Sequence, residues 1–122
     1  FWNGDPLRNP ASFNDDQNGN GFLFYPGPEG PLPSIRVEVL RDGMEDYDYL
    51  AILQEFVTTL QAKAEVASTP ETARLLTQAH ALLAIDPAIV ESMRTYTKDP
   101  ERLQQARAQI AEMIETLQRH SP

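Results

Sequence analysis

Apolar residues recur every three or four positions over most of the chain after residue 34, which is the spacing of a buried helix face. Ser34 follows Pro31 and Pro33 and is a favourable helix N-cap. We therefore predict a first helix over about 34–62, with a broad apolar face made by Leu40, Tyr47, Leu50, Leu53, Val57 and Leu60. Gly43 interrupts this pattern and leaves two alternatives open, a continuous helix or a break at that residue.

Three further helices are predicted from their caps. The second, over about 69–84, begins at the capping-box pattern Ser68–Glu71. The third, over about 87–96, follows Asp86, and its apolar side carries Ile89, Val90 and Met93. The fourth, over about 100–119, has Asp99 as N-cap and a narrow stripe of Leu103, Ala106, Ile110, Met113 and Leu117. Short connections favour antiparallel neighbours, so residues 34–122 predict a small antiparallel helical bundle in a mainly α fold.

The first 33 residues have a different composition. All six glycines lie at or before Gly43, and six of the ten prolines lie at or before Pro33. Residues 1–33 therefore predict a loop-rich segment with one short strand, 22–25, which lacks polar alternation and suits burial on both faces. A loop-rich segment with one buried strand is typical of the middle of a domain. We therefore expect the chain to be a segment of a longer protein.

Composition excludes several classes of function. The net charge is −8 and the only lysines are Lys63 and Lys98, which argues against nucleic acid and anionic membrane surfaces as partners. No apolar run approaches the roughly 18–20 residues of a membrane span. The chain contains no cysteine, so disulfides, thiolate metal sites and cysteine nucleophiles are excluded.

Candidate metal and catalytic motifs are weak. Asp16–Gly21 matches the first half of a calcium loop, but its twelfth position is Gly27 in place of the bidentate Glu, so an ordinary turn is favoured over a calcium-stabilised domain. His80 lies between Leu76 and Leu83, which predicts a core or boundary histidine with one satisfied ring nitrogen. We predict no metal site, no cofactor and no catalytic residue within the chain.

Charged residues are unusually dense at the start of the first helix. Arg41 stands three residues after Glu38 and four before Glu45, the spacings of intrahelical ion pairs. We predict a partly buried structural charge network made by Arg36, Glu38, Arg41, Glu45 and Asp46. The alternative is that these carboxylates contact a substrate directly.

Aromatic residues gather in the loop-rich segment. Six of the ten lie in the first 25 residues: Phe1, Trp2, Phe13, Phe22, Phe24 and Tyr25. Beside Asn and Asp, such residues suit a sugar-stacking cleft, but they also suit the cover of a core where regular structure is scarce. Both interpretations stay open at this point.

Two consecutive motifs resemble a known family. N-G-N-G-F-L-F-Y-P-G, beginning at Asn18, and P-S-I-R-V-E-V-L-R-D-G-M-E-D-Y-D-Y-L, ending at Leu50, are similar to the closing signature of the glycoside hydrolase family 123-like catalytic domain. Asn20 stands where the family usually has Asp, and Asp48 where Glu is common. The first change weakens a role for that turn carboxylate, and the second is conservative.

The resemblance implies the C-terminal end of a (β/α)₈ barrel, with 22–25 as its last strand and the helix from Ser34 as the one that closes the ring. It implies a bacterial parent related to retaining β-N-acetylgalactosaminidases in which the substrate's acetamido oxygen attacks. The compartment is left unknown, with a secreted or periplasmic location as the candidates. The catalytic Asp-Glu pair of that family lies upstream, and Glu45-Asp46 is not that pair because its order is reversed.

Because barrel active sites lie at the C-terminal ends of the strands, the resemblance makes Trp2, Tyr25 and Asn20 the candidate substrate-binding residues. The expected partner is carbohydrate, through the parent enzyme, and the chain alone is expected to be inactive. A barrel end without its neighbours is also expected to self-associate or to contact the rest of the parent protein. The alternative function is a non-catalytic helical protein-interaction module.

Overall fold

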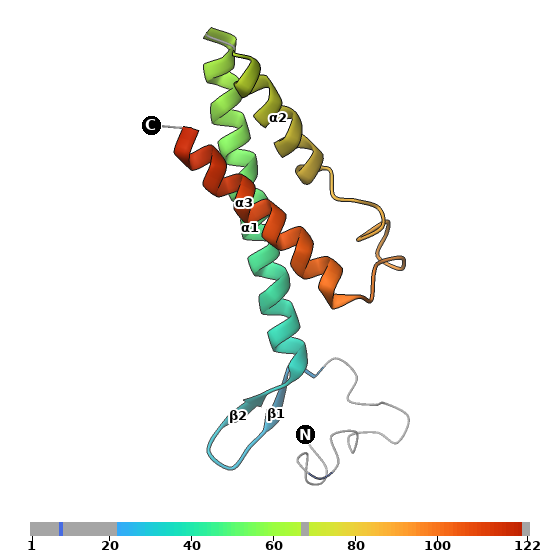
Figure 1. Ribbon diagram of the computed structural model, residues 1–122. Helices are drawn as coiled ribbons and strands as arrows, with labels where there is room; N and C mark the ends of the chain where they lie inside the picture. Colours follow the sequence, from blue (N-terminus) through green and yellow to red (C-terminus); the bar gives the residue numbers. More distant parts are fainter. Residues whose placement is uncertain (1–7, 9–21, 67–68, 121–122) are drawn as a thin grey trace. The chain divides into compact units, whose positions relative to one another are not determined.

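The computed structural model describes residue 8 and residues 22–66 and 69–120. Helices take up 68% of these residues, which confirms the mainly α prediction. The elements are strands β1 (Phe24–Pro26) and β2 (Pro31–Pro33) and helices α1 (Ile35–Val66), α2 (Pro70–Leu83) and α3 (Pro100–His120), as Figure 1 shows. The chain divides into two compact units, residues 1–45 and 46–122.

The first unit contains a β-hairpin in place of the single strand predicted at 22–25. β1 pairs antiparallel with β2, with Tyr25 opposite Leu32. The Gly27 N–H donates to the Gly30 carbonyl at 3.0 Å and closes the connection. A Cβ at Gly27 would lie 2.6 Å from that carbonyl oxygen, so this close approach requires glycine. The prediction missed β2 because Pro31 and Pro33 argue against a strand, yet both strands of a two-stranded ribbon are edge strands, where proline is tolerated.

Ser34 joins the hairpin to α1. Its N–H donates to the Leu23 carbonyl and its Oγ donates to the Phe22 carbonyl, both at 2.8 Å. The same Oγ accepts the Arg36 N–H at 3.2 Å, which satisfies a free donor of the first helical turn. Ser34 is buried, and the predicted cap is therefore also the point where the helix is tied to the strand before it. α1 continues through Gly43 without a break, since one glycine costs a long helix only about 1 kcal/mol.

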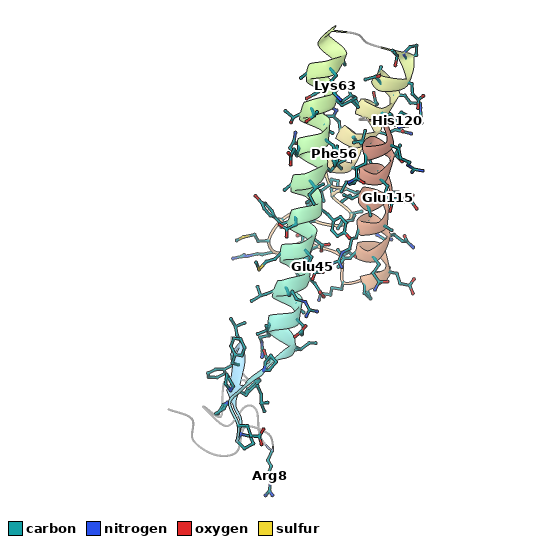
Figure 2. All side chains as sticks on the ribbon, turned by 90° about the vertical axis from the view of Figure 1, so that its left-hand side faces the viewer. Arg8, Glu45, Phe56, Lys63, Glu115 and His120 are labelled. Carbon is teal, nitrogen blue, oxygen red and sulfur yellow. The ribbon has the colours of Figure 1, made fainter. Side chains whose placement is uncertain are left out.

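The core lies in the second unit, where three helices meet. In Figure 1, α2 runs back beside the end of α1, and α3 crosses α1. Among the residues that the structure describes, the seven buried apolar ones come from all three helices: Leu53, Val57 and Leu60 of α1, Leu75 and Ala79 of α2, and Ile114 and Leu117 of α3. Figure 2 shows the side chains of these helices, with Phe56 of α1 among them. No helix in the described residues is long and apolar enough to cross a membrane.

The predicted apolar face of the first helix was too broad. Leu53, Val57 and Leu60 are buried, whereas Leu40 and Tyr47 are exposed. Six residues at about 100° each place Tyr47 roughly 120° around the helix from Leu53, so the two side chains lie on different sides. The same correction applies to Leu103, which is exposed although it belongs to the predicted stripe of the last helix.

α2 is capped at both ends by residues that its sequence only partly indicates. Thr69, rather than Ser68, is the N-cap, and its side chain accepts the Thr72 N–H at 3.1 Å. At the C-terminal end Ile85 has a φ of +44°. A left-handed conformation is normal for glycine at this position but strained for a β-branched residue.

The prediction of a helix over about 87–96 is wrong, because the structure has no helix between α2 and α3 in these described residues. Its backbone turns back on itself, with a bridge between Val90 and Tyr96. Asp86 Oδ1 accepts the Ala88 N–H at 2.8 Å, and Ser92 Oγ accepts the Thr95 N–H at 3.0 Å. These side-chain acceptors offer the backbone an alternative to helical hydrogen bonds, which explains why an apolar spacing of helical type did not produce a helix.

Candidate functional site

Tyr25 is the predicted substrate-binding residue that the structure describes. It lies in β1 and is half-buried. Its ring packs obliquely against Phe22, with the ring centroids 6.2 Å apart and the planes at 42°. Its hydroxyl oxygen lies 3.4 Å from Arg36 Nη1, which also reaches the Phe22 carbonyl at 3.5 Å. The hairpin therefore presents an aromatic ring that is held from one side by another ring and from its polar tip by a guanidinium.

The other two predicted substrate-binding residues, Trp2 and Asn20, lie outside the described residues. The partial calcium motif Asp16–Gly21 lies outside them as well. The structural description of the candidate sugar site therefore consists of Tyr25 with Phe22 and Arg36.

The charges predicted to form one network occur in three separate arrangements. The first is centred on Arg41, which contacts Glu38 at 2.7 Å and Glu45 at 3.6 Å. These are the predicted helical spacings, but the Arg41 side chain is 63% exposed, so this cluster is in solvent rather than partly buried. Steps of three and four residues keep the three side chains on one side of the helix.

Arg36 and Asp46 have other partners. Arg36 contacts the hairpin, as described above, and Asp46 contacts α3. Arg107 Nε lies 2.5 Å from Asp46 Oδ1 within the second unit. Both side chains are partly exposed, and the pair joins residues 61 positions apart in the sequence. The sequence carried no signal for Arg107, because an arginine on a solvated helix is ordinary until the helices are assembled.

His80 is exposed, which corrects the prediction of a core or boundary position. Its Nδ1 lies 2.7 Å from the Leu76 carbonyl and its Nε2 lies 3.1 Å from Gln61 Nε2. Across the part of the chain that the structure describes, no three or more His, Cys, Asp or Glu side chains gather as metal ligands do.

The start of α2 carries the group whose titration is most clearly perturbed. Glu71 Oε1 lies 2.8 Å from Arg74 Nη2. The hydrogen bond from Arg74, and then its positive charge, lower the pKa of Glu71 from its ordinary value. Because both groups are in solvent, this pair is a surface feature and not a catalytic acid.

A cleft of about 740 Å³ opens between the three helices of the second unit. Its walls are mainly apolar, and the Asp46–Arg107 pair lies along them; the apolar residues include Leu50, Leu82, Ile85, Ile89, Leu103 and Ile110. Its volume is within the roughly 300–1,000 Å³ usual for small-molecule pockets. The sequence analysis did not predict the cleft. The one available signal was the pair of apolar residues Leu103 and Ile89, which have no buried position of their own when residues 87–96 do not form a helix.

Comparison with known proteins links part of the chain to a family. The family model described as "Glycoside hydrolase 123, catalytic domain" matches residues 1–53. No curated protein and no solved structure matches the chain. The matched segment includes Tyr25, Arg36, the Arg41 cluster and Asp46, whereas Arg107 and most of the cleft lie beyond it. Over residues 1–53, therefore, the chain resembles the catalytic domain of glycoside hydrolase family 123, as the motifs between Asn18 and Leu50 predicted.

Proposed function

We propose that this chain is the C-terminal segment of a glycoside hydrolase catalytic domain, in which β1 is the last strand of a (β/α)₈ barrel and α1 the helix that closes it. The match of residues 1–53 to the family model carries the proposal. The strand-then-helix order of β1 and α1, joined through Ser34, is what one repeat of such a barrel requires. The hairpin that β2 adds then occupies the βα connection, where barrel active sites lie.

The substrate class follows from the resemblance. It points to a β-N-acetylgalactosaminide, cleaved with retention by attack of the substrate's own acetamido oxygen on the anomeric carbon. An Asp-Glu pair would orient the acetamido group and protonate the leaving oxygen. The contacts of Glu45 with Arg41 and of Asp46 with Arg107 support a structural role for both carboxylates. We propose that the pair lies outside this chain, which by itself has no hydrolytic activity.

Tyr25 is the residue to which we assign sugar contact in the described part of the chain. Its ring offers an apolar face and its hydroxyl a polar edge, the combination that amphipathic ligands use. Arg36 holds the hydroxyl end, and Phe22 supports the ring. Trp2 and Asn20, from the same matched segment, are proposed as further pocket residues on the strength of the resemblance.

Hydrolysis of an aryl β-N-acetylgalactosaminide by the chain joined to the rest of its catalytic domain tests the proposal. We expect turnover by the complete protein and none by the chain alone. Tyr25→Ala should raise KM or lower kcat/KM by roughly tenfold or more, equivalent to about 1.4 kcal/mol of lost binding. Tyr96→Ala is the matched control, because Tyr96 is an exposed tyrosine outside the matched segment. Turnover by the chain alone, or equal effects of the two substitutions, would refute this assignment.

A second candidate function applies to the helices beyond the match. The second unit closes its own core and holds the 740 Å³ cleft, which favours a non-catalytic protein-interaction module. Calorimetry with N-acetylgalactosamine and size-exclusion chromatography separate the two functions. Binding of a protein partner by the complete protein, with no saccharide binding, would support the module alone.

A further inference from the structure

The first unit exposes most of the large apolar side chains that the structure describes in it, and buries none of them fully; Phe22, Tyr25 and Val37 are half-buried. In the second unit, by contrast, three helices bury a shared core. In residues 22–45 the one buried residue is Ser34, which is polar. The exposed apolar residues of this region come from the hairpin, the residue before it and the first turns of α1: Leu23, Phe24, Leu32, Ile35, Val39, Leu40 and Met44.

The exposed apolar side chains that belong to α1 occupy two sides of that helix. Ile35 and Val39 are one turn apart on one side, and Leu40 and Met44 are one turn apart on another. At about 100° per residue, Met44 lies roughly 140° around the helix from Val39. The Arg41 cluster with Glu38 and Glu45 takes the remaining side. A helix on the surface of a soluble domain needs only one apolar side, so two apolar sides indicate packing against more than one neighbour.

We infer that this surface is where the preceding part of the same catalytic domain packs onto the chain, with Leu40 and Met44 as its anchors. The inference rests on the proposed function and adds the contact surface to it. The identity of the occupant comes from the position of the family match. The matched segment, residues 1–53, contains the exposed surface, whereas six of the seven core residues lie outside it. Among the described residues of the matched segment, Leu53 is thus the one buried apolar residue, and residues 22–45 contain none.

The Arg41 cluster sets the limit of this surface. Arg41 is 63% exposed and Glu45 51% exposed, and both are paired with each other. Such ions lose little by staying in water and would lose hydration on burial. The partner therefore covers the two apolar sides of α1 and leaves the charged side at the rim, which is the usual arrangement of a packed interface.

Met44→Glu tests the inference, with Met93→Glu as its matched control. Met44 is 69% exposed and Met93 97% exposed, but Met93 lies outside the matched segment. Thermal unfolding is measured for both variants in two forms, the chain alone and the chain joined to the rest of its catalytic domain. We expect Met44→Glu to leave the midpoint of the chain alone within about 2 °C and to lower that of the joined protein by about 5 °C or more, because only there is the new charge buried. Met93→Glu should change neither. Should the joined Met44→Glu protein not fold, Met44→Ala against Met93→Ala gives a milder form of the same comparison.

Equal midpoints for the two joined variants would overturn the inference. So would a chain that dimerises when alone, loses that dimer with Met44→Glu, and shows no effect of the substitution in the joined protein, because a second copy would then cover the surface. The proposed function is scored separately by hydrolysis. A joined protein that is inactive but selectively destabilised by Met44→Glu would refute the glycosidase activity and still support the interface.

Discussion

Arg107 of α3 donates a hydrogen bond from Nε to Asp46 Oδ1 of α1 at 2.5 Å. The pair joins the segment that resembles a glycoside hydrolase to a helix that lies outside the match. Asp46 is about two turns before Leu53, so the ion pair extends the contact of α1 with α3 beyond the buried core. The last helix is thus attached to the closing helix of the proposed barrel by charge as well as by apolar packing.

Removal of this pair should cost a modest amount of stability. The two side chains are 33% and 43% exposed, so solvent screens the attraction and we expect a coupling of about 0.5–1 kcal/mol in a double-mutant cycle of Asp46→Ala and Arg107→Ala. Urea unfolding of the chain measures it. Asp48→Ala, an exposed acid two residues away, is the control and should show no coupling to Arg107→Ala. A coupling near zero would mean that apolar contacts alone hold α3.

Arg41→Ala should change the free energy of unfolding by less than about 0.5 kcal/mol, because its partners are in solvent and alanine favours the helix. The partly buried network predicted from the sequence would make this loss larger, but the exposure of Arg41 removes the reason for it. Urea unfolding at low and high salt checks the value, and Leu53→Ala, a fully buried residue, should cost about 2–5 kcal/mol in the same assay. A loss for Arg41→Ala close to that of Leu53→Ala would contradict the exposed position.

Ile85→Gly should be more stable than Ile85→Ala. Both substitutions remove the same apolar side chain from the wall of the cleft, but only glycine relieves the left-handed backbone at φ +44°. That conformation costs a non-glycine residue about 1–2 kcal/mol, and the extra freedom of glycine in the unfolded chain offsets part of it. We expect a difference of about 0.5–1 kcal/mol by thermal unfolding. The reverse order would show that Ile85 is not left-handed in solution.

Glu71 should titrate below an ordinary glutamate. Arg74 lowers its pKa from the usual 4.5, so the pair contributes its full stabilisation above the unfolded-state value and loses it as the pH falls through the lowered pKa. NMR titration of the Glu71 side-chain carboxyl carbon measures the shift. Arg74→Gln should move the midpoint back up toward 4.5. An unchanged Glu71 midpoint in Arg74→Gln would assign the shift to another group.

The candidate site was predictable where its signal was a motif and unpredictable where it depended on assembly. Tyr25 and Arg36 belong to the motifs that identified the family resemblance, and the structure brings them within 3.4 Å. Arg107 and the cleft gave no such signal, because their partners are distant in the sequence. The single predicted charge network divided into separate arrangements for the same reason, since helical spacing determines which charges are neighbours on α1 but not what α3 offers to Asp46.

The sequence by itself determined the local structure. Ser34, Pro70 and Pro100 mark the starts of the three helices because caps and prolines act within one turn of the backbone. Tertiary structure alone decided which side of each helix is buried, so Leu53 lies in the core and Tyr47 in solvent on the same helix. It also decided that Asp46 of α1 pairs with Arg107 of α3. The physical reason is that burial and long-range pairing depend on neighbours from other helices, and neither caps nor periodicity specify those neighbours.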